Sequence, residues 1–148
     1  MLISLFLFVA VSASANPFFI RATGSRYVDT NLYGVNAGMI LKNNLLFSLD
    51  LGFANVREVH QTIRYNYKIS AQSTYVGLGY SFGKLYANAL GGYISYSKTY
   101  QVYVEDNLHL FDLDYGLEVG YAFKSLYVGG AYLVHNGPVI KVGFLFNR

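Results

Sequence analysis

The sequence predicts an all-β protein: an eight-stranded antiparallel transmembrane β-barrel with short periplasmic turns and extended outer hairpins. Three observations lead to this fold class, namely a shortage of charge, an alternation of side chains with period two, and an uneven spacing of turns. Of 148 residues, 53% are hydrophobic and 13% are charged, whereas charged residues make up about 25% of an ordinary soluble domain. Cysteine is absent, and a net charge of +3 without a basic run argues against nucleic-acid binding.

The N-terminal segment has the features of a secretory signal peptide. An apolar run from Leu2 to Val11 precedes Ala13-Ser14-Ala15, which matches the A-x-A cleavage pattern. The run is shorter than the roughly 20 apolar residues of a membrane-spanning helix, although an N-terminal helical anchor is the alternative. We therefore expect residues 1–15 to be a signal peptide and residues 16–148 to form a barrel domain in the cell outer membrane.

The rest of the chain alternates large apolar side chains with small or polar ones. In residues 110–123 the odd positions from Phe111 to Phe123 are apolar, and the even positions after Leu110 are glycine, alanine or acids. A strand with two unlike faces has this period, whereas a helix does not. The same alternation predicts strands in 18–23, 33–41, 45–54, 76–82 and 140–146. Composition predicts two more, 85–96 and 126–134, whose facing stays open because glycine and alanine occur at both sets of positions.

Tight turns alternate with longer polar connections along the chain. Lys42-Asn43-Asn44, Gly83-Lys84 and Lys124-Ser125 are tight hairpin turns. Most of the connections between them are longer, and these are residues 25–31, 57 to about 68, and 97 to about 109; residues 135–137 are a short exception. Short turns at one end and longer loops at the other are typical of bacterial outer-membrane barrels, whose turns are periplasmic.

A secreted soluble barrel of lipocalin type is the rival interpretation, and composition argues against it. The polar face consists of Gly, Ser, Asn, Ala and a few acids, which are too small and sparse to solubilise a surface. The apolar face is bulky, so it would overfill the interior of eight strands but suits a wall facing lipid. Aromatic residues near strand ends are expected to form the interfacial girdles: Tyr33, Tyr80, Phe82, Tyr121, Phe123, Phe144 and Phe146.

The small, polar face carries the charges expected in the barrel lumen: Arg21, Asp50, Asp112, Asp114, Glu118 and Lys141. Unpaired charges in a narrow interior are costly, so these residues are predicted to form a network of salt bridges and hydrogen bonds that plugs the lumen. Eight strands enclose about enough room for side chains. An ion-conducting path, and hence a small passive pore, is the alternative.

Alternation continues beyond the length that a membrane needs. Strands over residues 62–82 and 85–104 would measure about 65 Å at about 3.3 Å per residue, against an apolar band of about 25 Å. The middle hairpins should therefore project above the outer leaflet, and a slip of phase near residues 70–73 predicts a bulge. Projecting edges could bind a strand of a host or cell-surface protein, or lipopolysaccharide phosphates; ordinary solvated loops are the alternative. The candidate contact residues are Arg57, Arg64, Tyr65, Tyr67, Lys68, Lys98 and Tyr100.

The sequence provides little support for catalysis or for a metal site. His60, His109 and His135 fall in the outer connections without the spacing of metal ligands. The one catalytic set that can be assembled combines His109 with Asp106 or Asp112 and with Ser95 or Ser97, and no motif supports it. We therefore expect no enzyme activity, no cofactor and no metal; a lipid A-modifying enzyme is the alternative.

The leader, eight strands, lysine-bearing turns, extended middle hairpins and the closing Val139-Ile140-Lys141-Val142-Gly143-Phe144-Leu145-Phe146 together resemble the OmpX/Ail group and the wider OmpA-like barrels. The closing segment is similar to the C-terminal strand signal that the barrel assembly machinery reads. The resemblance implies a monomeric, non-enzymatic outer-membrane protein with surface adhesion or defence roles. Its partners would be outer-membrane lipid and lipopolysaccharide, and a host or cell-surface protein.

Overall fold

The computed structural model describes residues 16–27, 30–54, 57–59, 67–100 and 108–146, with backbone only at 57–59. Nearly all of them belong to strands. In chain order the strands are β1 (Phe18–Tyr27), β2 (Thr30–Ile40), β3 (Leu45–Ala54), β4 (Arg57–Val59), β5 (Tyr67–Phe82), β6 (Leu85–Tyr100), β7 (Leu108–Phe123), β8 (Leu126–Leu133) and β9 (Gly137–Phe146). No helix among the described residues is long and apolar enough to cross a membrane.

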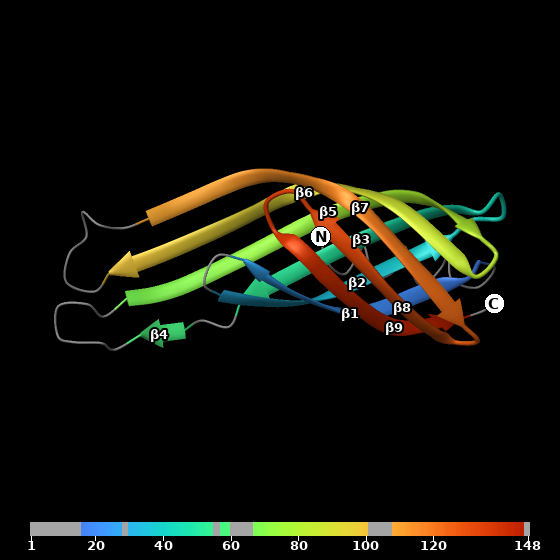
Figure 1. Ribbon diagram of the computed structural model, residues 1–148, viewed down its shortest axis with the longest axis horizontal. Coiled ribbons are helices and arrows are strands. Elements are labelled where there is room, and N and C mark those ends of the chain that lie inside the picture. The colour runs from blue at the N-terminus through green and yellow to red at the C-terminus, as the bar shows by residue number, and fades with distance from the viewer. Residues whose placement is uncertain (1–15, 28–29, 55–56, 60–66, 101–107, 147–148) are drawn as a thin grey trace.

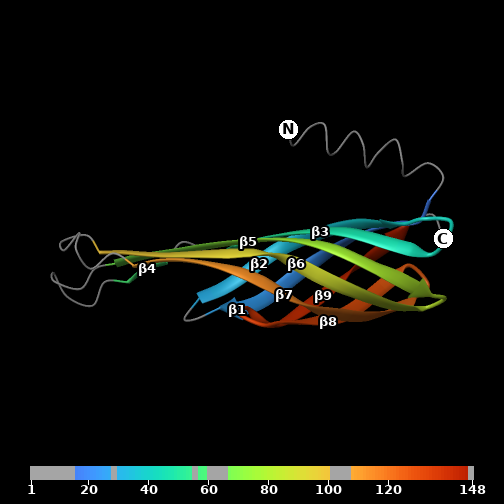
Figure 2. The ribbon, with the colours of Figure 1, turned by 90° about the horizontal axis from the view of Figure 1, so that it is seen from above.

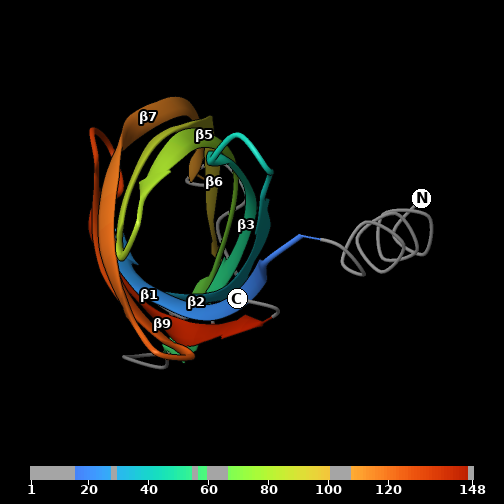
Figure 3. The ribbon, with the colours of Figure 1, turned by 90° about the vertical axis from the view of Figure 1, so that its right-hand side faces the viewer.

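The strands close into a barrel. Pairing runs in the order β3-β2-β1-β9-β8-β7-β6-β5, and a further pairing of β3 with β5 joins the two edges. All neighbours are antiparallel, and Figure 3 shows the closed ring along its axis. The short β4 lies outside this ring and pairs with the start of β5. The predicted fold class, an eight-stranded antiparallel barrel, is therefore confirmed.

The two ends of the barrel differ. The three tight turns gather at one end, while β5, β6 and β7 extend beyond the other strands at the opposite end (Figures 1 and 2). Backbone hydrogen bonds join the turns to neighbouring strands: Ser81 N donates to Asn44 O over 2.9 Å and Ala122 N donates to Lys84 O over 2.8 Å. This end is therefore a rigid rim, since each turn is held by the next hairpin.

The facing of 85–96 and 126–134, which the sequence left open, follows from the structure. On β6 the even positions, such as Asn88 and Leu90, are buried inside the barrel. On β8 the buried side chains are Tyr127, Ala131 and Leu133. Gly120 of β7 also faces inward, and a Cβ at this position would overlap the ring of Tyr127 on β8. Missing side chains on one strand thus make room for a large ring on the next.

The bulge predicted near residues 70–73 does not lie in β5 itself; on the β3/β4 side the register shifts by one residue opposite this segment, from Phe53 opposite Gln72 to Arg57 opposite Ile69. The pairing of β5 with β6 runs without interruption from Tyr67 opposite Tyr100 to Phe82 opposite Leu85. The odd positions of β5 face inward along most of its length. What changes along β5 is the kind of residue on its inner face, which is a large apolar side chain at Ile69 and a glycine at Gly77. A change of environment along one regular strand produced the slip of phase in the sequence.

Three buried clusters fill the interior from end to end. The cluster next to the turns comprises Phe19, Ile40, Leu46, Tyr86, Ala122, Tyr127 and Leu145. A middle cluster comprises Tyr75, Leu90, Ala131, Leu133 and Val139. The cluster under the projecting strands comprises Tyr27, Leu32, Ile69, Ala71, Ile94 and Tyr96. Four of the buried charges, Arg21, Asp50, Glu118 and Lys141, lie between the first two clusters, so apolar layers border them on both sides.

Candidate functional site

Four of the six predicted lumen charges form one buried network. Lys141 Nζ lies 2.5 Å from Asp50 Oδ2 and 2.8 Å from Glu118 Oε2. Arg21 forms an ion pair with the other carboxylate oxygen of Glu118, which also accepts a hydrogen bond of 2.8 Å from the hydroxyl of Tyr127. Two cations therefore balance two carboxylates inside the wall, which removes most of the cost of burying them.

Aromatic rings and amides complete the surroundings of Arg21. Its guanidinium carbon lies 4.1 Å from the ring centroid of Phe19 and 4.2 Å from that of Tyr127, so cation–π attraction adds to the ion pair. Arg21 Nε donates to Asn36 Oδ1 over 2.7 Å, and Asn36 in turn donates to Asp50 over 3.3 Å. The network thus links β1, β2, β3, β7, β8 and β9 across the lumen.

Asp114, also predicted to belong to the charge network, has a separate task. It accepts hydrogen bonds from the hydroxyl of Tyr75 over 2.9 Å and from the backbone N–H groups of His135 and Asn136 over 2.9 and 3.1 Å. Asn136 is itself buried and accepts from Ser25 Oγ over 3.1 Å. Asp114 therefore fastens the β8–β9 turn over the outer mouth of the lumen.

Asp112 also stands apart from the four-residue network. Asp112 is the inward-facing residue of β7 next to Asp114, on the side of the projecting end. It accepts a hydrogen bond of 3.0 Å from the hydroxyl of Tyr27. Tyr27 ends β1 beyond the apolar band, and burial, helped by this bond to Asp112, raises its pKa to about 12. The phenol therefore keeps its proton and remains a donor at physiological pH.

The space left between the charge network and the β8–β9 turn is small. A cavity of about 10 Å³ lies there, which is about the room that one water molecule needs. Its lining residues are Thr23, Ser25, Leu32, Asp50, Gly52, Ser73, Tyr75, Leu133, Asn136 and Val139. These residues come from β1, β2, β3, β5, β8 and β9 and from the turn between β8 and β9.

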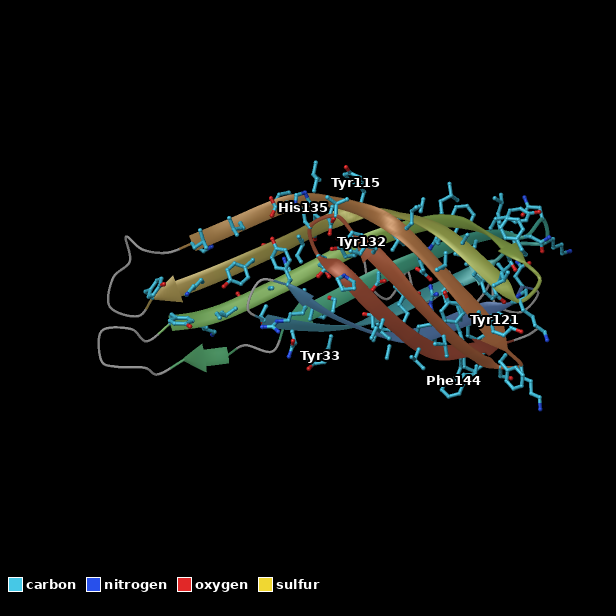
Figure 4. All side chains as sticks on the ribbon, in the orientation of Figure 1. Tyr33, Tyr115, Tyr121, Tyr132, His135 and Phe144 are labelled. Atoms are coloured by element: carbon cyan, nitrogen blue, oxygen red, sulfur yellow. The ribbon has the colours of Figure 1, made fainter. Side chains whose placement is uncertain are left out.

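The predicted girdle residues are exposed on the outer wall, but in two separate bands. Six of them, Tyr80, Phe82, Tyr121, Phe123, Phe144 and Phe146, surround the turn end. Tyr33 lies nearer the other end, in the same zone as Tyr115 and Tyr132 (Figure 4). Sequence reasoning missed Tyr115 and Tyr132 as girdle members, although Tyr115 is at an odd, outward position of β7.

The projecting part of the sheet brings three predicted contact residues together. The rings of Tyr67 and Tyr100 have centroids 5.5 Å apart, and Lys98 Nζ lies 4.0 Å from the centroid of Tyr67. Lys68 is exposed and points to the opposite face of the sheet. The side chains of Arg57, Arg64 and Tyr65 lie outside the described residues. Tyr67, Lys98 and Tyr100 therefore contact one another, and the lysine makes a cation–π contact with each ring.

One edge of the projecting sheet is open. β8 pairs with β7 from Gly116 to Phe123, and a hydrogen bond from Val134 N to Tyr115 O, 2.9 Å, continues that pairing by one residue. Within the described part of the chain, no strand pairs with this side of Leu108–Leu113. Phe111 and Leu113 are 64% and 75% exposed on the same segment. The opposite border of the projection is covered, because β4 pairs with β5.

Comparison with known proteins rests on structure, since no protein-family model and no curated protein match the sequence. The attachment invasion locus protein Ail of Yersinia pestis, in complex with the heparin analogue sucrose octasulfate, matches with a TM-score of 0.61 and 11% identity, over 89% of this chain and 97% of that one. The N-terminal β-barrel domain of Pseudomonas aeruginosa OprF matches with a TM-score of 0.54 and 18% identity, over 89% and 98%.

The chain has the fold of small outer-membrane barrels. A further match, the backbone structure of the outer-membrane protein Ail in a phospholipid bilayer nanodisc, has a TM-score of 0.60 and 10% identity, over 89% of this chain and 99% of that one. At such low identity the likeness establishes the fold, and the roles of individual residues must come from their own geometry.

In this fold the candidate catalytic residues divide between two faces of the wall. Ser97 Oγ lies 2.9 Å from His109 Nδ1, as neighbours on paired strands of the exposed outer face. Asp112 points inward to Tyr27 instead, and Asp106 lies outside the described residues, as does His60. No described group of His, Cys, Asp and Glu side chains is arranged to hold a metal ion. Ser97 and His109 therefore form an exposed hydrogen bond on the outer face of the sheet, without an acid beside them among the described residues.

Proposed function

We propose that this chain is a non-enzymatic protein of the bacterial outer membrane that binds molecules outside the cell through its projecting hairpins. Residues 1–15 would direct it across the inner membrane, and residues 16–148 would insert as a monomer with the help of the barrel assembly machinery. The fold and the continuous apolar outer wall support the location. Lipid would contact this wall, and lipopolysaccharide would surround the zone of Tyr33, Tyr115 and Tyr132.

The observation that carries the surface role is the open edge of β7. In an antiparallel strand, successive residues direct their backbone groups to alternate sides. Because Tyr115 O bonds toward β8, the backbone groups of His109, Phe111 and Leu113 point to the open side. A row of free donors and acceptors beside exposed apolar side chains is the geometry that accepts an added strand. The partner would therefore be an extended segment of a host or cell-surface protein.

Adherence of bacteria that display the protein tests this role. Cells with and without the protein would be compared on plastic coated with basement-membrane extract, and we expect several-fold more adherent cells with it. Phe111→Pro should remove the gain because it deletes one edge donor, and proline is tolerated on edge strands. Phe111→Val keeps the N–H and should retain most of the binding. Equal adherence with and without the protein, or an unchanged Phe111→Pro variant, would contradict the proposal.

We further infer that the lumen is closed to ions. Arg21, Lys141, Asp50 and Glu118 pair across it, and the cavity above them has room for about one water molecule. Planar bilayers containing the refolded protein should therefore show no stable single-channel openings. Openings that change with Arg21→Ala would replace this inference with a small passive pore.

The contact between Ser97 and His109 favours one alternative, a lipid-modifying hydrolase. Nucleophilic catalysis needs an acid that orients the histidine and a pocket that excludes water, and Asp112 faces the wrong side of the wall for this purpose. Mass spectrometry of lipid A from cells with and without the protein decides between the two. Identical acyl chains support the non-enzymatic role, whereas a change that Ser97→Ala abolishes would support catalysis.

A further inference from the structure

Each tight turn at the closed rim of the barrel carries one lysine. Lys42 lies in the β2–β3 turn, Lys84 in the β5–β6 turn and Lys124 in the β7–β8 turn, and all three are exposed. None of the eight acidic residues of the sequence lies in these turns; they are Asp29, Asp50, Glu58, Glu105, Asp106, Asp112, Asp114 and Glu118. The rim therefore presents positive charge that no turn carboxylate neutralises.

Two of the lysines, Lys84 and Lys124, stand directly beyond the outward aromatic band. Phe82 precedes the turn that holds Lys84 and is 61% exposed, while Phe123 precedes Lys124 and is 59% exposed. Lys124 Nζ lies 5.9 Å from the ring centroid of Phe123. Rings of this kind sit at the boundary between hydrocarbon and headgroups, and a lysine next to them extends its ammonium toward the phosphates.

The backbone at Lys124 adds an independent observation. Lys124 has a φ of 54°, whereas Gly83, which holds the matching place in the β5–β6 turn, has a φ of 68°. The two turns share the frame Phe-x-x-Leu, in Phe82–Leu85 and Phe123–Leu126. Glycine adopts this left-handed region freely, while a side chain makes it costly. A lysine in this place therefore tolerates backbone strain, and a requirement for its charge would explain the residue.

We propose that Lys42, Lys84 and Lys124 form a ring that binds the phosphates of anionic phospholipids in the leaflet facing the turns. This inference rests on the proposed membrane location and adds a specific lipid to it. Backbone hydrogen bonds join the turns to neighbouring strands, so the backbone from which the three lysine side chains extend is held in place around the rim. Each basic residue at a membrane surface is expected to favour an anionic lipid about five-fold.

Spin-labelled lipids in bilayers of phosphatidylcholine measure this preference directly. The relative association of labelled phosphatidylglycerol over labelled phosphatidylcholine would be compared for the wild-type protein and for Lys42→Gln/Lys84→Gln/Lys124→Gln. We expect a preference of at least about five-fold for the wild type at low salt, falling toward one in the triple variant and at high salt. Lys68→Gln/Lys98→Gln, which removes two lysines from the projecting end, should keep the wild-type preference.

The possible outcomes separate this inference from the proposed membrane location. A barrel that inserts but shows no preference for phosphatidylglycerol, or a triple variant that keeps the preference, overturns the lysine ring alone. A protein that enters no bilayer overturns the location as well. If the triple variant fails to fold, Lys124→Gly provides the same test, because it removes one charge and relieves the backbone; a preference left unchanged would again overturn the ring.

Discussion

Strands β5, β6 and β7 pass through two regions that differ in what is buried inside, and they keep one register with one another. Between the rim and the Tyr115 zone, paired charges such as Glu118 are buried inside between two apolar clusters, and the outer face is apolar, as at Leu117. In the projection, the inner face is apolar at Ile69 and Tyr96, and the outer face combines polar residues such as Gln72 with exposed apolar ones such as Phe111. The pairings of β5 with β6 and of β6 with β7 keep one register through both regions. The distribution of apolar side chains over the two faces therefore changes along strands whose pairing with one another does not change.

The two regions also depend on different forces. In the lower region, charges such as Arg21 and Glu118 are buried and must be paired, because one buried unpaired charge costs several kcal/mol. In the projection, the buried groups are mainly hydrocarbon and rings, where losing a side chain costs its contacts and leaves a cavity. Substitutions in the two regions should therefore differ in size and in how far they spread.

Removing the central carboxylate should have the largest effect. Glu118→Ala leaves both Arg21 and Lys141 short of a partner, so we expect a loss of about 3 to 5 kcal/mol in the free energy of unfolding. Urea titration of the refolded barrel, followed by its heat-modifiable migration on gels, measures this loss. Asp112→Asn is the control, since it keeps an acceptor for Tyr27. Equal stability of the two variants would show that the network does not hold the barrel together.

An arginine introduced on the outer face of the wall should have the second-largest effect, and its cost should differ between the two regions. Leu117→Arg places a cation on the apolar band and should cost about 2 to 4 kcal/mol, as lipid-facing arginines do near the bilayer midplane. Ser95→Arg, on the outer face of the projection, should change stability by less than about 0.5 kcal/mol. Unfolding in lipid vesicles gives both values. A costly Ser95→Arg would mean that the apolar band reaches further than its side chains indicate.

A cavity in the projection should remain a local defect. Ile94 is fully buried under the projecting strands, and Ile94→Ala should cost about 2 kcal/mol, the low end for such a change, since this cluster is small. We expect faster proteolysis of the projecting hairpins, while the lower barrel keeps its resistance to urea. Loss of heat-modifiable migration in this variant would contradict the independence of the two regions.

Relief of backbone strain at the rim should give the smallest effect. Lys124→Gly should stabilise the barrel by about 1 kcal/mol in neutral detergent, because glycine accepts positive φ without a steric cost. Lys84→Gly, at a place where no positive φ occurs, is the matched control and should bring no gain. Similar changes in both variants would remove the argument from strain.

Much of the fold could be predicted because alternation is a local property of a strand. Period two along residues 110–123 does not depend on which strand lies alongside, and the lysine-bearing turns are short-range signals as well. The same pattern placed a bulge in residues 70–73, whereas these residues pair regularly with β6 and the register shift lies on the β3/β4 side of β5. Alternation in the sequence indicates which face of a strand is apolar. A break in the alternation need not mean a break in the strand, because the apolar side chains can change face along a regular backbone.

The strands, the tight turns and the set of charges on the small face can be identified from local patterns in the sequence. Which of these charges meet depends on how the barrel closes, since Arg21 and Glu118 are 97 positions apart and become neighbours when β7, β8, β9 and β1 pair in one register. The tertiary structure also separated Asp114 and Asp112 from that network and turned Tyr127 inward over Gly120. The physical reason is that alternation assigns a side chain to a face of its own strand, whereas its partners depend on closure and register, which are properties of the whole sheet.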